Sequence, residues 1–195
     1  MARWTPGARG RLEQAAFELY SENGFDNTTV AEISARAGLT ERTFFRHFAD
    51  KREVLFGGAT TLQDELVGAT ANAPDDVAPI QAVAAGLEAA AALLSERVAL
   101  ARQRQAIIAS SAELRERELI KLASLGDALA ETLRKRGVGE PAASLTAEIG
   151  IAVFRTAFER WIDEANDQDF PRLINASLEQ LKSLAAGERP LVDVG

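Results

Sequence analysis

The spacing of apolar residues is the feature that most constrains how this chain can fold. Alanine, leucine, glutamate and arginine dominate, and no run alternates apolar and polar residues with the period of two that a half-buried strand requires. Turn signals rich in glycine, asparagine and proline separate stretches of helical length. The sequence therefore predicts an all-α protein of about nine helices.

Composition excludes much of enzyme chemistry. The 195 residues include no cysteine and only His47 as a histidine, so disulfides, thiol nucleophiles and histidine-cluster metal sites are ruled out. The sequence also lacks a phosphate-binding P-loop and a G-x-G-x-x-G motif. We therefore expect a chain that is not an enzyme and needs neither a cofactor nor a metal.

The sequence carries no targeting or membrane segment. Residues 1–6 lead into a polar stretch without the apolar core of a signal peptide. The longest apolar stretch, residues 82–94, contains Glu88 and is shorter than the roughly 18 residues of a membrane span. We expect a soluble, cytoplasmic protein with no membrane partner.

Charge is distributed unevenly along the chain. The net charge of -7 argues against a nucleic-acid partner, because lysine and arginine drive binding to phosphates. Residues 1–52, however, hold eight basic and seven acidic residues, whereas residues 53–195 hold 14 basic and 22 acidic residues. The excess negative charge thus lies entirely in the second segment.

The first 55 residues predict a three-helix bundle followed by the start of a fourth helix. Thr29 to Glu32 and Asp50 to Glu53 have the spacing of capping boxes, and Thr40 follows a glycine turn. These signals place the helices at about 6–23, 29–37, 40–48 and 51–72. The second and third helices are short and are separated only by the turn Gly38-Leu39-Thr40. Two such helices must cross steeply, which predicts a helix-turn-helix.

The third predicted helix has two chemically different faces. Phe44 and Phe48 share the inward face. The outward arc carries side chains that can bond to base edges in a DNA major groove, namely Thr40, Arg42, Thr43, Arg46 and His47. Thr28, Thr29 and Lys51 are candidate phosphate contacts, and Arg3, Arg9 and Arg11 form a basic arm upstream. The pattern alone leaves open an ordinary solvated face and a structural role for His47.

A spaced run of residues between 20 and 55 carries a family resemblance. It reads Tyr20-x3-Gly24-Phe25-x2-Thr28-Thr29-Val30-x2-Ile33-x3-Ala37-Gly38-Leu39-Thr40-x2-Thr43-Phe44-Phe45-x-His47-Phe48-x2-Lys51-x3-Leu55. This run resembles the DNA-binding domain of TetR/AcrR-family transcriptional regulators. The resemblance implies phosphate contacts from Thr28, Thr29 and Lys51. It also implies base or backbone contacts from the outward arc of the third helix, namely Thr40, Arg42, Thr43, Arg46 and His47. Phe45 stands where the family often has a tyrosine whose hydroxyl reaches a phosphate, so its role as a contact is open.

The sequence predicts a second helical domain at residues 53–187, followed by a tail at residues 188–195. The predicted helix after Pro141 is apolar on two faces: one stripe holds Leu145, Ile149, Ala152 and Thr156, and the other holds Phe154, Phe158, Trp161 and Ile162. A helix apolar on two faces must bury both. We expect a four-helix homodimer interface that includes Phe158, Trp161, Ile174, Leu178 and Leu181. A thick monomeric core is the alternative.

Small side chains between 77 and 95 suggest a ligand cavity. The residues predicted to line it are Leu62, Leu66, Val83, Leu87, Leu94, Ile107 and Leu122. The alternative is that the alanines of this segment merely let helices approach closely. The family resemblance implies an inducer pocket whose occupation changes the separation of two DNA-reading domains. Residues 110–118 and 152–161 further resemble mycofactocin-type regulators, which implies acyl-CoA-like ligands, with Arg97, Arg102 and Arg104 as candidates to meet a phosphate.

These observations together predict a DNA-binding transcriptional regulator. The expected form is a homodimeric repressor that binds a near-palindromic operator through the helix at about 40–48 and is released by a small apolar ligand, with an acyl-CoA-like molecule as a candidate. The alternative is an architectural or protein-partner regulator of the same fold that has no small-molecule inducer.

Overall fold

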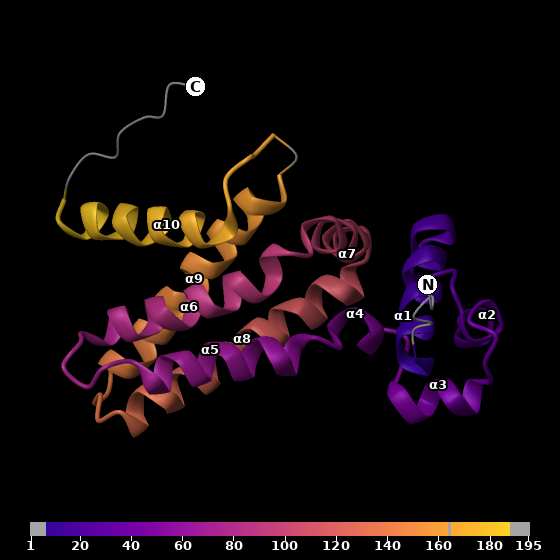
Figure 1. Cartoon of the computed structure of the whole chain (residues 1–195), viewed down its shortest axis with the longest axis horizontal. Coiled ribbons are helices and arrows are strands. Elements are labelled where there is room, and N and C mark those ends of the chain that lie inside the picture. The colour runs from indigo at the N-terminus through magenta and orange to yellow at the C-terminus, as the bar shows by residue number, and fades with distance from the viewer. Residues whose placement is uncertain (1–6, 164, 188–195) are drawn as a thin grey trace, which may run out of the picture. The chain divides into compact units, whose positions relative to one another are not determined.

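The structure, a computed structural model, describes residues 7–163 and 165–187. Over those ranges all regular secondary structure is helical, which confirms the predicted all-α class (Figure 1). No described helix is long and apolar enough to cross a membrane. The residues Arg3 and 188–195, for which an arm and a tail are predicted, lie outside the described residues.

The described residues form two compact units. The first, here called the head, comprises residues 7–59 and 99–120, and the second, here called the body, comprises residues 60–98 and 121–187 except 164. The predicted domain boundary at residues 52 and 53 remains a prediction. Residues 99–120, from the middle of the chain, pack with the N-terminal segment and belong to the same unit.

The head begins with the predicted bundle and contains further helices. Its elements are α1 (Ala8–Asn23), α2 (Val30–Arg36), α3 (Glu41–His47), α4 (Glu53–Phe56), α7 (Val98–Ser110) and the start of α8 (Ala112–Lys135). The predicted helix at 51–72 is divided, because α4 ends before Gly57 and α5 (Ala59–Asn72) begins after Gly58. A Cβ on Gly57 would lie 2.5 Å from Arg9 Nη2, so the bare glycine lets the α1 side chain approach this break.

Side-chain caps fix where the helices of the head begin. Thr29 and Glu32 form the predicted capping box, in which the Thr29 hydroxyl accepts from the Glu32 backbone N–H and the carboxylate accepts from the Thr29 N–H. Thr40 caps α3 by accepting from the Thr43 N–H at 3.3 Å. Asp50 accepts from the backbone N–H groups of Arg52 and Glu53 before α4. The predicted starts of α2 and α3 are confirmed, whereas α4 begins at Glu53, later than predicted, and its N-cap residue Arg52 makes no side-chain cap.

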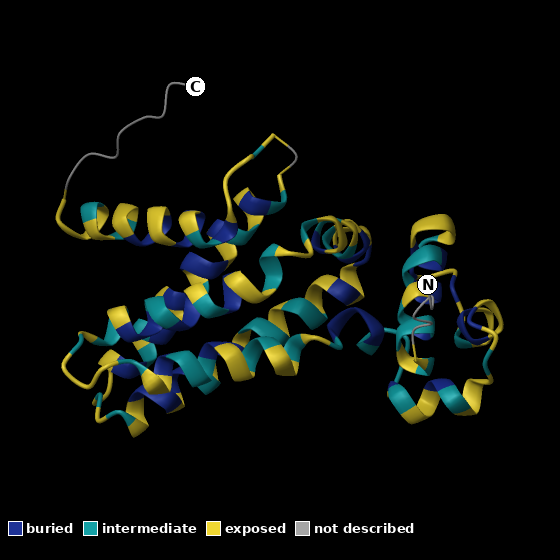
Figure 2. Ribbon diagram, viewed as in Figure 1, coloured by how far each residue is buried: buried dark blue, intermediate teal, exposed yellow. Residues whose placement is uncertain are grey.

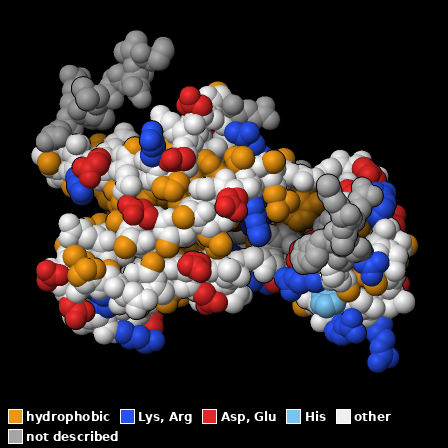
Figure 3. Space-filling view, in the orientation of Figure 1, with side chains coloured by type: hydrophobic (Ala, Val, Ile, Leu, Met, Phe, Trp, Pro, Cys, Tyr) orange, Lys and Arg blue, Asp and Glu red, His pale blue; other side chains and the backbone are white. Residues whose placement is uncertain are grey.

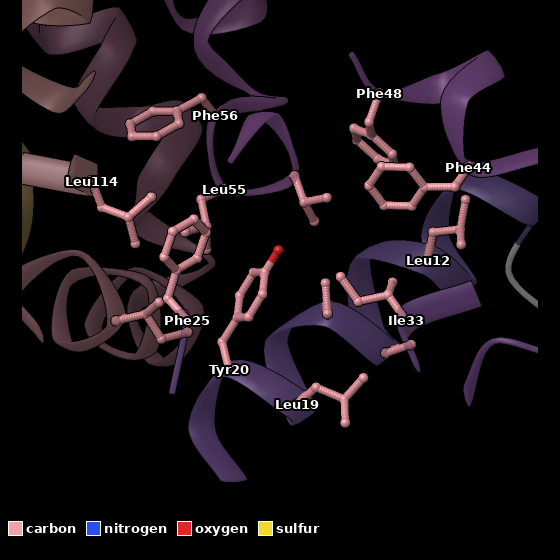
Figure 4. Packing of buried hydrophobic residues seen from close by; sticks show 14 of the residues in the cluster. Leu12, Leu19, Tyr20, Phe25, Ile33, Phe44, Phe48, Leu55, Phe56 and Leu114 are labelled. Atoms are coloured by element: carbon pink, nitrogen blue, oxygen red, sulfur yellow. The ribbon is translucent and has the colours of Figure 1, made fainter. Parts of the chain in front are cut away.

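The core of the head gathers apolar side chains from every one of its helices (Figure 4). Phe44 of α3 is fully buried with Leu12 of α1 and Ile33 of α2. Ile108 and Leu114, from α7 and α8, belong to the same cluster and are also fully buried. The bundle therefore needs the distant segment 99–120 to complete its core.

Ion pairs within the head join α4 to α7 and α8. The Arg104 guanidinium donates to the Leu55 carbonyl oxygen at 2.8 Å and to Glu118 Oε1 at 2.9 Å, and burial lowers its pKa. Arg117 Nε donates to Glu53 Oε1 at 3.0 Å. Arg104, one of the candidates for a coenzyme A phosphate, is thus already engaged inside the protein.

The body is built from α5, the rest of α8, α6 (Pro79–Ser95), α9 (Ala142–Ile162) and α10 (Phe170–Ala185). Helices α6, α9 and α10 pack against one another. Aromatic rings join α9 to α10: the Trp161 and Phe170 rings stack with centroids 4.8 Å apart, and the Phe158 ring meets the Phe170 ring edge-on at 5.8 Å. This cluster uses one of the two apolar stripes of α9 inside the chain.

At two glycines of the body, the backbone of one helix lies against atoms of a neighbouring helix with no room for a side chain. A Cβ on Gly86 of α6 would lie 2.6 Å from the Leu66 carbonyl oxygen and 2.2 Å from Thr70 Oγ1, both on α5. A Cβ on Gly150 of α9 would lie 2.6 Å from Val83 Cγ1 on α6. Real side chains essentially never come this close, so only glycine allows these crossings.

Lys51 ties the start of α4 to the turn between α1 and α2. Its ammonium donates to the carbonyl oxygens of Phe25 at 2.8 Å, Thr28 at 2.9 Å and Asp26 at 3.4 Å, and lies 4.3 Å from the centre of the Phe25 ring. The Tyr20 hydroxyl donates to the Lys51 carbonyl oxygen at 2.6 Å, and burial raises the pKa of this phenol. A lysine ammonium has three N–H donors, so all of them have partners here.

We predict that Lys51→Met destabilises the fold, because the turn carbonyls lose a charged donor while the apolar stem is retained. The expected loss is about 2–4 kcal/mol of unfolding free energy, measured by urea denaturation followed by circular dichroism. Arg42→Met, at an exposed residue without a partner among the described residues, is the control and should unfold like the wild type. Equal midpoints for Lys51→Met and the wild type would contradict the capping role.

Candidate DNA-binding site

Helices α2 and α3 form the predicted helix-turn-helix. Gly38 adopts φ +65° in the turn between them, a left-handed conformation that glycine takes without steric cost. The Gly38 N–H donates to the Ala35 carbonyl oxygen at 3.0 Å, and the Leu39 N–H donates to the Ser34 carbonyl oxygen at 2.8 Å. These bonds close the end of α2 and redirect the chain into α3.

The outward face of α3 combines free cations with an exposed aromatic ring. Arg42 and Arg46 are exposed, and neither guanidinium forms a hydrogen bond or ion pair with another described residue. Phe45 lies between them in sequence and is 55% exposed. Together with Thr43, these three side chains line one surface hollow. Figure 2 shows the exposed face of α3 turned away from the buried side of the head.

The other cations of α1 to α4 are mostly engaged within the head. Arg9 pairs with Glu13 at 2.9 Å, Arg36 pairs with Glu22 at 2.8 Å, and Arg52 pairs with Asp50. Figure 3 shows Lys and Arg side chains gathered over the α3 end of the head. Because pairing neutralises many of the other basic residues, Arg42 and Arg46 supply most of the free positive charge on this face.

The hydroxyl groups of Thr40, the residue before α3, and Thr43 of α3 form a hydrogen bond with each other. Thr40 Oγ1 and Thr43 Oγ1 are 3.1 Å apart, and the helix cap holds Thr40 in place. Thr40 is exposed and Thr43 is half-buried, so each hydroxyl retains capacity for a further hydrogen bond. Their positions match the outward arc predicted from the helical period.

The candidate phosphate contacts at the start of α2 are less available than predicted. Thr28 is only 1% exposed, and its hydroxyl donates to the Gly24 carbonyl oxygen at 2.8 Å, so it is already used inside the protein. Thr29 is exposed but donates to Glu32 Oε2, and these hydrogen bonds hold the pKa of the Glu32 carboxyl below its usual range. A carboxylate at this helix start opposes an approaching phosphate. Lys51, the third candidate, has all its donors occupied.

His47 ends α3 and is half-buried. Its Nε2 atom is buried and has no hydrogen-bond partner among the described residues. No group of three or more potential metal ligands occurs in the described part of the chain. The predicted contact of His47 with DNA stays a prediction.

The predicted pocket residues fall in both units. Leu66, Val83 and Leu87 are buried in the body, and Leu62, Leu94 and Leu122 are half-buried there, whereas Ile107 belongs to the core of the head. Leu66 and Val83 flank the tight crossings at Gly86 and Gly150. Close packing at these points favours the alternative that small residues allow helices to approach.

The predicted dimer residues are buried or half-buried within the single chain. Trp161, Ile174 and Leu178 are buried, and Phe158 and Leu181 are half-buried. The other stripe of α9 is the exposed one: Leu145 is 58% exposed and Ile149 is 36% exposed, and Ala152 and Thr156 are exposed as well. Both apolar stripes can be recognised in the sequence, but helical periodicity does not show which stripe packs inside the chain and which is exposed.

Comparison with protein families assigns both parts of the chain. Residues 13–56 match the model for bacterial regulatory proteins of the tetR family. Residues 77–186, more than half of the chain, match the model for the MftR C-terminal domain. The first match covers α2 and α3, and the second covers α6 to α10.

Individual relatives agree with this assignment. A mycofactocin biosynthesis transcriptional regulator of Mycobacterium tuberculosis, MftR, is 25% identical over 77% of this chain and 78% of its own length. The transcriptional regulator TcmR of Streptomyces glaucescens is 33% identical over 42% of this chain and 36% of its own length. These relatives are transcriptional regulators, which confirms the expectation that the chain is not an enzyme.

Solved structures share the fold. SmeT, the repressor of a Stenotrophomonas maltophilia multidrug efflux pump, aligns with a TM-score of 0.60 and 23% identity over 91% of this chain and 89% of its own. FadR of Bacillus subtilis, in complex with stearoyl-CoA, aligns with a TM-score of 0.59 and 21% identity over 88% of this chain and 96% of its own. The chain therefore belongs to the TetR family of transcriptional regulators, with an MftR-type C-terminal domain.

Proposed function

We propose that the protein is a homodimeric repressor that binds a near-palindromic operator through α3 and leaves it when a small apolar ligand binds the body. The observation that carries the DNA-binding part is the outward face of α3, where Arg42 and Arg46 are exposed and unpaired among the described residues. Phe44 holds that helix in the core from the opposite side.

The chemistry of this face suits a major groove. An arginine guanidinium can donate two parallel hydrogen bonds to guanine O6 and N7, and a threonine can bond to a base or touch a thymine methyl. Arg42, Arg46 and Thr43 border one hollow, so they can act on neighbouring base pairs. Phosphate contacts from the exposed flank of α3 would orient the helix without specifying sequence.

A second subunit explains the exposed stripe of α9. Leu145 and Ile149 are one turn apart and apolar, and Ala152 and Thr156 continue their line with small side chains. Small and apolar side chains in one stripe allow two helices to pack closely around a two-fold axis. We therefore place the proposed interface on this stripe of α9. A symmetric dimer presents two α3 helices and so calls for a near-palindromic operator with half-sites about 34 Å apart or a multiple of that spacing.

The body is the proposed ligand domain. Its match to the MftR C-terminal domain and the stearoyl-CoA complex of FadR, a protein of like fold, support a test of acyl-CoA-like ligands. Since α5 and α6 touch at Gly86, a ligand among Leu66, Val83 and Leu87 would have to separate these helices. Such a ligand would have a higher affinity for the conformation that does not bind DNA. By linkage, bound DNA would lower the affinity for the ligand by the same factor by which the ligand lowers the affinity for DNA.

The tight crossings at Gly86 and Gly150 favour a second candidate. A closely packed body needs no ligand to be stable. The protein would then act as an architectural or protein-partner regulator with the same α3 surface. Ligand binding and DNA release, measured together, separate the two candidates.

Operator selection from random DNA tests the DNA-binding proposal. We expect the full-length protein to enrich a near-palindrome, and Arg46→Ala to lose about 1–3 kcal/mol of specific binding free energy while its base preference relaxes at one position per half-site. Arg36→Ala, which removes an arginine that pairs with Glu22, is the matched control. An equal loss on selected and random DNA would show that Arg46 contacts only phosphate, and a failure to enrich any sequence would overturn the proposal.

A charge in the exposed α9 stripe should separate the subunits. Ile149→Asp would bury an unpaired carboxylate in the interface, so we expect a monomer by light scattering at micromolar concentration, with helical content unchanged. Leu119→Asp places the same charge on an exposed apolar residue of α8 and should stay dimeric. A wild-type protein that is itself monomeric under these conditions would refute the dimer.

Thermal melting with stearoyl-CoA tests the ligand proposal. We expect the midpoint to rise by several degrees at saturating ligand, because a ligand that binds only the folded state stabilises it. The same concentrations should release the selected operator in a fluorescence anisotropy assay, and free coenzyme A should do neither. An unchanged midpoint and retained operator across a series of acyl chain lengths would favour the second candidate.

A further inference from the structure

Phe45 is an exposed apolar side chain in the N-terminal part of the head, where the other large apolar side chains are buried or half-buried. Among the described residues 7–56 it is the one large hydrophobic side chain that is left exposed. The other aromatic rings of α3 and the turn before α2, those of Phe25, Phe44 and Phe48, are buried. An isolated exposed ring is common on proteins, but this one lies on the helix that faces DNA.

The position of the ring is well defined. The Phe45 ring meets the Phe44 ring edge-on, with centroids 5.5 Å apart and planes at 82°. Phe44 is fully buried, so it supports the neighbouring ring from inside the head. Phe45 also borders the hollow lined by Arg42, Thr43 and Arg46. The ring therefore stands beside two free guanidinium groups that draw a polyanion to the same surface.

The chemistry of the ring selects among the groups that DNA offers. A phenyl ring has no hydrogen-bond donor or acceptor, so covering a phosphate with it removes water from the anion without compensation. In the major groove the one apolar group on a base edge is the C5 methyl of thymine, and phenylalanine is among the side chains that contact it. The neighbouring arginines can meet the phosphates and guanines that the ring cannot.

We propose that Phe45 is a specificity-determining residue that packs on the C5 methyl of one thymine in each operator half-site. This inference rests on the proposed function, because it needs α3 in a major groove. It adds that one operator position is read by apolar contact and not by hydrogen bonds. Replacing that thymine with any other base removes the methyl group and weakens binding.

Uracil substitution provides a direct test, because it removes the thymine methyl and leaves base pairing intact. The probe is the duplex selected from random DNA, with each thymine replaced singly by uracil and binding measured by fluorescence anisotropy. For the wild type we expect one thymine per half-site at which uracil weakens binding about fourfold, the effect of exposing one buried methyl. Phe45→Ala should bind the thymine duplex more weakly and show no difference at that position.

Two further variants separate the contact from general effects. Phe45→Tyr keeps the ring and should keep the uracil difference. Leu100→Ala, which removes an exposed apolar side chain from α7, should leave both the affinity and the uracil profile unchanged.

Three outcomes would overturn the inference. If Phe45→Ala keeps the full uracil difference, another group such as the Thr43 methyl reads the thymine, and any equal loss of affinity on both duplexes comes from a contact of the ring elsewhere on the DNA. If no thymine is sensitive to uracil in the wild type, no thymine methyl is read by this surface. If the wild type enriches no sequence from random DNA, the proposed function itself fails, which is a different result from sequence-specific binding without a uracil effect.

Discussion

The burial of Phe44 and Phe48 is the interaction on which the DNA-facing surface depends. Helix α3 has only seven residues, and an isolated helix of that length is not stable in water. Phe44 is fully buried in the core of the head, and its ring lies 5.4 Å from that of Phe48. Truncation of one such buried ring to alanine costs about 3–5 kcal/mol. The outward side chains therefore hold fixed positions only because the inward ones are packed.

That dependence explains which parts of the site could be predicted from the sequence. Helix starts follow from local chemistry, and the caps at Thr29 and Thr40 appear where their spacing indicated. The two faces of α3 follow from the helical period, because Phe44 and Phe48 are four residues apart. Both features are set by neighbours in sequence, and such neighbours are visible without a structure.

Features set by distant partners could not be predicted in the same way. Lys51 looks like a phosphate-binding cation in the sequence, yet its ammonium bonds to carbonyl oxygens more than 20 residues away. Thr28 looks like a free hydroxyl but is buried against the end of α1. The same limit applies to α9, whose two apolar stripes are equally plain in the sequence. Only packing against α10 shows that the stripe with Trp161 is internal and the stripe with Ile149 is exposed.

The acidity of the chain and its affinity for DNA are compatible because charge acts locally. Arg9, Arg36 and Arg52 pair with carboxylates of the head, so they contribute little to the field that a phosphate experiences. Two unpaired arginines on α3 give a head modest non-specific affinity, since that affinity grows with the number of phosphates neutralised. A regulator with weak non-specific binding is less often trapped on the rest of the genome. Discrimination then depends on contacts with base edges, and Thr43 and Phe45 place uncharged side chains for such contacts beside the two arginines.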